Sequence, residues 1–201
     1  MKTMVIVGLD LTGVETRPTG YCEFVDMNIE TFLIYTDKEI LERITRIQPV
    51  IVAVDAPLSL PPGRKTLEGR NSSHLRDCDR ELLKKDIKFF PITLGPTRKL
   101  TERGNHLKKI FEGENFKAIE VYPGVAQDVL GIPRKQKGIE RLKAGLEALG
   151  IKGLNNKMSH HELDAVTCVY VGKLFLEREA VTYVTFSESI IMPKGKIGVK
   201  G

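Results

Sequence analysis

The sequence contains no tryptophan and only three cysteines, Cys22, Cys78 and Cys168. No two of them lie close along the chain, so the paired cysteines of a zinc site or a redox dithiol are missing. Widely spaced cysteines in odd number instead favour small, buried thiols. Walker loops, nucleophile elbows and zinc-ligand patterns are also absent. The sequence therefore excludes the enzyme classes that depend on these signatures.

Long apolar segments are missing as well. No apolar run approaches the roughly 20 residues that a membrane-spanning helix needs, and the first eight residues are too short for a secretory signal. We therefore expect a cytoplasmic protein with no membrane partner. The 201 residues include 41% hydrophobic and 28% charged residues, which is ordinary for a soluble globular domain.

Positive charge is concentrated in one part of the sequence. The formal net charge is +5, yet residues 64–109 alone carry thirteen Lys and Arg against six Asp and Glu. The rest of the chain is therefore slightly acidic. A basic segment on an acidic body indicates a polyanionic partner, and we expect nucleic acid, either DNA or RNA. A solvated helical surface of mixed charge would give the same composition.

The pattern of apolar residues predicts three strands, a helix, a fourth strand, and then helices around a fifth strand. Residues 4–9 and 50–54 are continuous apolar runs, typical of strands buried on both faces. Thr36 and Glu39 form a capping-box pattern for a helix over 37–47. This order predicts an RNase H-like α/β fold, with a mixed five-stranded sheet and flanking helices. The remaining expected strands cover 20–26, 30–35 and 117–122, with later helices over 125–130, 137–149 and 159–177 and a possible C-terminal hairpin over 181–192.

The composition of residues 57–116 differs from that of the rest of the chain. They contain many of the prolines, the basic excess and one expected helix over 73–86, but no dense apolar pattern. We interpret them as a large basic insertion within a single domain that covers residues 1–201.

Three acidic residues stand at or near the ends of expected strands. Asp10 follows the first strand, Asp55 follows the fourth, and Glu120 is near the close of the fifth. Parallel strands end at the same edge of a sheet, where ligands bind. Carboxylates gathered there repel one another unless a cation neutralises them. Each acid taken alone also fits a turn or a helix cap.

A fourth carboxylate comes from the long C-terminal helix. His161 and Asp164 are three residues apart and therefore share one helical face. The residues that follow Asp164 on this face are small or apolar, which allows close approach to the sheet. An acidic helix N-terminus would also explain part of this pattern. Four hard oxygen donors suit Mg²⁺ or Mn²⁺ better than zinc.

Several ordered motifs carry a resemblance to a known family. They are GLDLTG at 8–13, VDAP at 54–57, EVYP at 120–123 and HELDA at 161–165, together with the segments 76–83 and 94–104. The sequence resembles domain-of-unknown-function family 429 over roughly residues 4–178. That family is described as predicted nucleases with an RNase H fold. The large insertion departs from the minimal RNase H pattern.

A more distant resemblance concerns the acidic residues themselves. Asp10, His161 and Asp164 are placed in a way that is similar to RuvC-type Holliday-junction resolvases. Together the resemblances imply a metal-dependent nuclease that hydrolyses phosphodiester bonds with two ions. Asp10 would then bridge both ions, and Asp164 would hold the one on the nucleophile side. Asp55 and Glu120 would each hold one ion, while His161 would order a water or ligate directly.

Four arginines of the basic segment are candidate phosphate ligands: Arg76, Arg80, Arg98 and Arg103. Their planar guanidinium groups bind phosphate in a bidentate manner. Arg76 and Arg80 are four residues apart, so on a helix they share one face. The same arginines have possible partners close in sequence, namely Asp77, Asp79 and Glu102.

Two other functions stay open. One is a nucleic-acid-binding module that keeps the fold without cutting its ligand. The other is a nucleotide-binding protein like sugar kinases or actin-like ATPases, in which the turn at 10–13 would hold a phosphate. Such proteins usually need a second copy of the core, and 201 residues leave no room for one. A homodimer is a further possibility for any of these functions.

Overall fold

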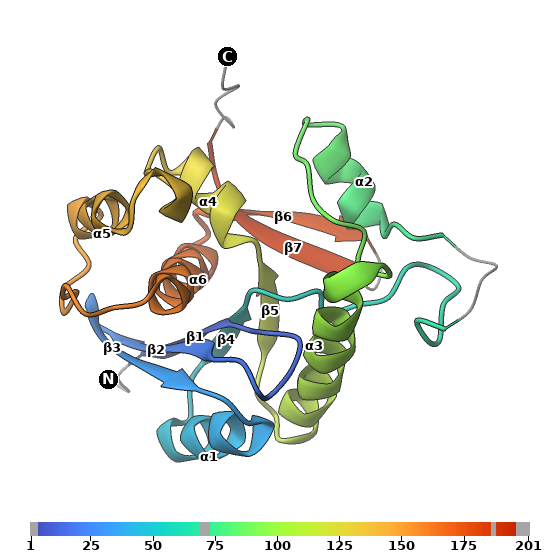
Figure 1. Cartoon of the computed structure of the whole chain (residues 1–201), viewed down its shortest axis with the longest axis horizontal. Coiled ribbons are helices and arrows are strands. Elements are labelled where there is room, and N and C mark those ends of the chain that lie inside the picture. Colours follow the sequence, from blue (N-terminus) through green and yellow to red (C-terminus); the bar gives the residue numbers. More distant parts are fainter. Residues whose placement is uncertain (1–3, 69–72, 186–187, 196–201) are drawn as a thin grey trace.

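The computed structural model of the chain describes residues 4–68, 73–185 and 188–195. Its seven strands form one mixed sheet in the order β3-β2-β1-β4-β5-β7-β6 (Figure 1). The strands are β1 Val5–Asp10, β2 Thr19–Val25, β3 Asn28–Ile34, β4 Ile51–Val54, β5 Ala118–Val121, β6 Ala180–Thr185 and β7 Glu188–Pro193. The helices are α1 Asp37–Ile47, α2 Asp77–Leu83, α3 Gly95–Gly113, α4 Pro123–Val129, α5 Ile139–Ala148 and α6 His160–Leu176, with a 3₁₀ turn η1 at Lys135–Lys137.

The pairing of the central strands defines the fold. β1 pairs with β2 in antiparallel and with β4 in parallel orientation, and β4 is parallel to β5. Parallel neighbours cannot be joined by a tight turn and need a crossover. α1 lies in the connection that leads from β3 to β4, and α3 in the one that leads from β4 to β5. A meander of three strands followed by two parallel strands is the RNase H-like arrangement, which confirms the predicted fold class.

The expected C-terminal hairpin is present and enlarges the sheet. β6 and β7 pair in antiparallel orientation, and β7 adds to the edge of β5 as a parallel neighbour. The sheet therefore has seven strands instead of the five expected for the core. The described residues form one sheet, so within them there is no second copy of the core of the kind that actin-like ATPases contain.

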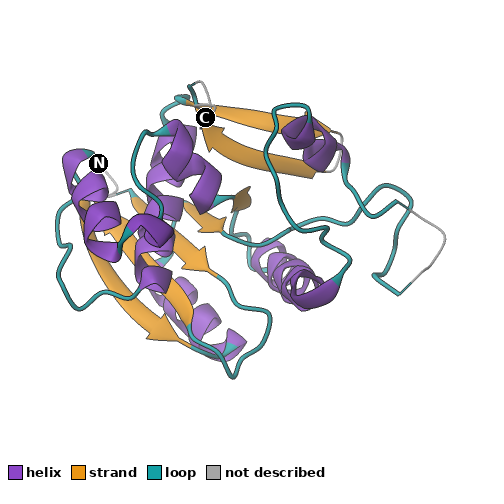
Figure 2. Cartoon of the chain, turned by 45° about the horizontal axis from the view of Figure 1, so that its top comes forward, coloured by secondary structure: helices purple, strands orange, loops and turns teal. Residues whose placement is uncertain are grey.

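Helices cover both faces of the central sheet (Figure 2). Successive residues of a strand point to opposite faces, and the two main apolar clusters follow this alternation. Ile6 belongs to the cluster under α5 and α6, whereas Val7 belongs to the cluster with α1 and α3. All three cysteines are buried free thiols, as the sequence indicated. Among the described residues, none of the helices combines the length and apolar character needed to span a bilayer.

α6 lies unusually close to the sheet because two glycines of the strands beneath it have no side chain. A Cβ atom on Gly8 would stand 2.2 Å from the backbone oxygen of Ala165, and one on Gly20 would stand 2.0 Å from that of His161. Any larger residue at either position would push the helix outward. The close approach brings the first turns of α6 over the carboxyl end of β1.

The segment 57–116 contains more regular structure than expected. Its N-terminal part has the short helix α2, whose bounds Asp77–Leu83 lie inside the predicted 73–86. Its C-terminal part is α3, the crossover helix that the parallel pair β4 and β5 requires. α2 has no core of its own but packs on the hairpin, where Cys78 and Leu82 join Ile190 and Met192 in a third apolar cluster. Its treatment as an insertion into one domain stays an interpretation.

Candidate functional site

Two of the predicted acids lie side by side at the carboxyl ends of neighbouring strands. Asp10 is the last residue of β1, and Asp55 directly follows β4. The parallel register pairs Leu9 with Val54, and the amide of Asp55 donates to the carbonyl of Leu9 over 2.8 Å. The Asp10 side chain is buried and Asp55 is partly buried. The strand ends thus place two carboxyl groups in one crevice.

The third acid, Asp164, reaches the same region from α6. It is buried at 4% exposure. One carboxylate oxygen accepts a hydrogen bond from Gln127 Nε2 at 2.8 Å, and the other accepts from Lys135 Nζ at 2.7 Å. The Gln127 amide also donates to Thr167 Oγ1 at 3.0 Å, which fixes its orientation. Neither Gln127 nor Lys135 carries a signal in the sequence that could have identified it.

The three acids interact electrostatically, which shifts the pKa of Asp55. Burial, followed by the negative charges of Asp10 and Asp164, raises the pKa of Asp55 well above its ordinary range, and Lys135 offsets only part of this. Burial alone would lower the pKa of Lys135, but its hydrogen bond to Asp164 and the surrounding acids raise it. Lys135 therefore offsets only part of the repulsion among the three acids.

His161 contacts the cluster through Asp10. Its Nδ1 atom lies 2.5 Å from Asp10 Oδ2. The ring centroids of His160 and His161 are 4.1 Å apart. Burial and the neighbouring His161 lower the pKa of His160. The imidazole of His161 is thus oriented by a carboxylate and stands at the edge of the site.

Glu120 has a different partner from the one the sequence suggested. Its carboxylate is buried at 6% exposure in β5. Arg76 donates to both of its oxygens, over 2.6 and 2.7 Å, and the amide of Leu58 donates over 2.8 Å. Glu120 is therefore neutralised by an arginine instead of sharing a cation with the other three acids.

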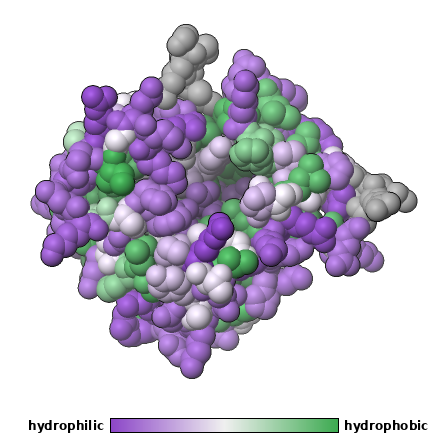
Figure 3. Space-filling model, in the orientation of Figure 1, coloured by the Kyte–Doolittle hydropathy of each residue, from purple (hydrophilic) through white to green (hydrophobic). Residues whose placement is uncertain are grey.

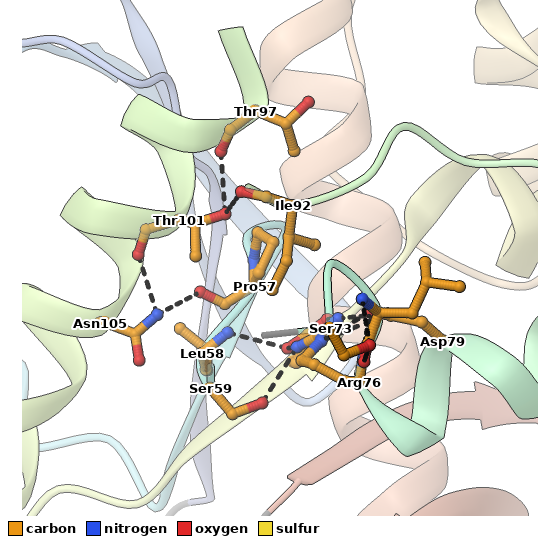
Figure 4. Close-up of polar contacts among 12 residues, drawn as sticks. Pro57, Leu58, Ser59, Ser73, Arg76, Asp79, Ile92, Thr97, Thr101 and Asn105 are labelled. Atoms are coloured by element: carbon orange, nitrogen blue, oxygen red, sulfur yellow. Dashed lines mark hydrogen bonds and ion pairs between the residues drawn. The ribbon is translucent and has the colours of Figure 1, made fainter. Parts of the chain in front are cut away.

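The environment of Arg76 corrects its expected role as a phosphate ligand. Arg76 is only 1% exposed. All five of its N–H groups have protein acceptors: Nε donates to Asp79, one terminal nitrogen to Glu120 and Ser59, and the other to Glu120 and Asp79. Figure 4 shows Arg76 between Asp79 and the loop that leaves β4. A saturated, buried guanidinium cannot also bind a phosphate.

The remaining arginines also have protein partners. Arg103 is buried and donates to Asp37 and to the carbonyls of Thr12 and Tyr35, so it ties α3 to the start of α1. Arg80 pairs with Asp77, and Arg98 pairs with Glu102. These are the local pairings that the sequence left open. The Arg80 and Arg98 side chains are 43% and 39% exposed, so both can still reach an external ligand.

The donor atoms fit a divalent cation in chemistry but are not yet gathered around one point. Asp10, Asp55 and Asp164 offer hard oxygens, and their excess negative charge favours a cation. In the part of the chain that the structure describes, however, no three His, Cys, Asp or Glu side chains converge as ligands of one ion. Asp10 is held by His161 and Asp164 by Lys135. Ion binding would require these side chains to turn.

A cavity of about 180 Å³ opens beside Asp55. The cavity was not among the sites predicted from the sequence. Its lining residues come from the loop after β4, from α2 and the residue before it, from the loop before α3 and the first turns of α3, from β5 and the residue after it, and from β7: Asp55, Ala56, Pro57, Arg76, Asp79, Leu82, Phe89, Phe90, Ile92, Thr97, Leu100, Glu120, Val121, Tyr122 and Ile190. The adjacent aromatic residues Phe89 and Phe90, within a basic segment, were the signal that could have indicated it.

The strand order and the acids at the strand ends define the class of this molecule: it is an RNase H-like α/β protein. Among solved structures it is similar to the RuvC structure of Thermus thermophilus, with 12% identity over 92% of this chain and 99% of that chain and a TM-score of 0.47. No protein-family model matches the chain, and no curated protein matches it. The resemblance to family 429, the cytoplasmic location and a homodimer stay predictions.

Proposed function

We propose that the protein is a divalent-metal-dependent nuclease that hydrolyses phosphodiester bonds at the cluster of Asp10, Asp55 and Asp164. One observation carries this proposal. Asp10 and Asp55 end two neighbouring parallel strands, and Asp164 of α6 interacts with Asp55 in the same crevice, so three carboxyl groups stand in one site. Hard carboxylate oxygens at the ends of parallel strands are suited to Mg²⁺ or Mn²⁺.

Each residue of the site would have its own role in the reaction. The three aspartates would hold the cation, which would supply positive charge to the attacked phosphate and its water. His161, oriented by Asp10, accepts a proton at its free ring nitrogen or positions the water. Lys135 lies close enough to Asp164 to contact a phosphate oxygen once Asp164 turns toward the cation. Exposed Arg80 and Arg98 bind the flanking backbone phosphates.

The partner of Glu120 favours one ion over two. A two-ion site of the kind implied by the sequence would need Glu120 as a ligand, yet both of its oxygens accept from Arg76. We therefore assign the first ion to the three aspartates. A second ion would bind only if Glu120 separated from Arg76.

A cleavage panel tests the proposal. With Mn²⁺, the protein is expected to cleave at least one substrate among single strands, duplexes, hybrids and branched junctions, and to leave a 5′-phosphate and a 3′-hydroxyl. Asp10→Asn, Asp55→Asn and Asp164→Asn should each remove nearly all activity without abolishing substrate binding. Asp26→Asn is the matched control, because Asp26 is exposed in the turn between β2 and β3. Activity that survives in all three cluster variants would refute the assignment.

One observation favours a second candidate, a nucleic-acid-binding module without catalysis. His161 and Lys135 already contact Asp10 and Asp164, so the cluster is partly compensated without any cation. Under this alternative, nucleic acid binds but is not cut across the whole panel, and Mn²⁺ leaves the melting temperature unchanged.

A further inference from the structure

The cavity beside Asp55 is continuous with the acid cluster through one shared residue. Asp55 lines the cavity, and its carboxyl group also interacts with those of Asp10 and Asp164. Figure 4 labels other lining residues near the loop that leaves β4, namely Pro57, Arg76, Asp79, Ile92 and Thr97. A ligand group in this cavity would therefore stand next to the atoms that the proposed reaction uses.

The walls of the cavity are mainly aromatic and aliphatic. Phe89, Phe90 and Tyr122 line it, and the Phe90 side chain is 80% exposed. A phenylalanine so exposed contributes little to the core and is available to an external ligand. In the space-filling view, hydrophobic residues border a hollow near the centre of this face, toward α2 (Figure 3).

The charged residues of the cavity offer few hydrogen bonds to a ligand. Arg76 uses all five N–H groups within the protein, and Asp79 and Glu120 are its acceptors. What remains for a ligand is the aromatic lining of Phe89, Phe90 and Tyr122, because nucleobases stack on aromatic side chains. The cavity is thus suited to a flat, aromatic group that is held by stacking.

The size of the cavity and the charge around it restrict the class of ligand further. The cavity of about 180 Å³ is smaller than the 300–1,000 Å³ typical of pockets for drug-sized molecules, so it suits a single ring system. Lys88, next to Phe89, is exposed and can meet a phosphate attached to that ring system. A nucleotide combines both features, because its sugar joins a heteroaromatic base to a phosphate.

We propose that this cavity binds one unpaired nucleobase of a single-stranded nucleic acid and thereby positions the neighbouring phosphodiester at Asp55. The inference rests on the proposed nuclease function and names its substrate class. A base inside a duplex is stacked and paired and cannot enter such a cavity without being extruded. Because stacking is tolerant of base identity, the site should accept any base and discriminate between unpaired and paired strands.

Binding of a single-stranded oligonucleotide that contains one 2-aminopurine tests the proposal. The measurement is made in EDTA, so that no cleavage occurs, and the protein has no tryptophan to interfere with the fluorescence. Wild type should bind the single strand, quench the fluorophore by stacking, and bind the matching duplex more weakly without quenching. Phe90→Ala should weaken single-strand binding roughly 5- to 150-fold, the range for loss of one base–aromatic contact. Phe90→Leu, which keeps apolar bulk, should lose most of the quenching.

Tyr35→Ala is the matched control, because Tyr35 is an exposed aromatic residue, at 43% exposure, outside the cavity. It should bind and quench like wild type. Unchanged binding and quenching in both Phe90 variants would overturn the proposal, as would a free mononucleotide that binds as tightly as the oligonucleotide. Failure of the nuclease proposal gives a different result, in which binding and quenching persist but Mn²⁺ produces no cleavage.

Discussion

The buried pairing of Arg76 with Asp79 and Glu120 makes a quantitative prediction about stability. Arg76 is 1% exposed, Asp79 1% and Glu120 6%. Replacing Arg76 with methionine keeps most of the side-chain volume but leaves two buried carboxylates without their cation. Removal of one partner from a buried ion pair costs about 3–5 kcal/mol. For a chain of this length, such a loss lowers the melting temperature by roughly 6–20 °C.

Urea unfolding followed by far-ultraviolet circular dichroism measures this loss in Arg76→Met. Arg80→Met is the matched control, because Arg80 pairs with Asp77 at the surface with 43% of its side chain exposed, and exposed pairs contribute only about 0–1 kcal/mol. Adding Glu120→Gln to Arg76→Met should cost less than the sum of the two single changes, because the second change removes a charge that the first has left unpaired. A loss below about 1 kcal/mol in Arg76→Met would refute the reasoning.

Three further predictions concern the acid cluster and the surface arginines. Mn²⁺ at about 100 times its Kd should raise the free energy of unfolding by about 2.7 kcal/mol, and Asp10→Asn should abolish this gain in a thermal melt; a full response of the variant would remove Asp10 from the site. Burial and the charges of Asp10 and Asp164 raise the pKa of Asp55 in the folded protein. The contribution of Asp55 to the free energy of unfolding is therefore fully present below its unfolded pKa of about 3.9, and it is lost as the pH rises through its folded pKa. In EDTA, Asp55→Asn should therefore be more stable than wild type at neutral pH and lose this advantage in acid, and unfolding curves with identical pH dependence would contradict the shift. Replacing Arg80 and Arg98 together with alanine should weaken nucleic-acid binding and reduce its salt slope by about two, whereas an unchanged slope would exclude both as phosphate contacts.

The parts of the fold that depend on local pattern were predictable from the sequence. The apolar run before Asp10 and the one before Asp55 identified two buried strands, and the acid after each run marked its carboxyl end. The spacing of His161 and Asp164 placed both on the first turns of α6. In each case neighbouring residues carry the information, because strand and helix periodicity act over short distances.

The partners of Glu120 and the extent of α3 were not predictable in the same way. Arg76 is 44 residues away from Glu120 in the sequence, and nothing local distinguishes it from Arg80, which remains at the surface. α3 was included in the insertion because residues 57–116 carry the basic excess and lack a dense apolar pattern. Gly104 has a packing reason: a Cβ atom there would stand 2.7 Å from the carbonyl of Pro57.

The attachment of α2 to the C-terminal hairpin joins two parts of the chain that are distant in the sequence. The acid cluster needs only β1, β4 and α6, whereas the wall of the cavity also includes Leu82 of α2 and Ile190 of β7. Residues more than a hundred positions apart must therefore meet before the cavity closes, and β7 is the last strand of the described chain. The three aspartates of the cluster come from none of these late elements, so shortening the hairpin should open the cavity and leave the carboxylates in place.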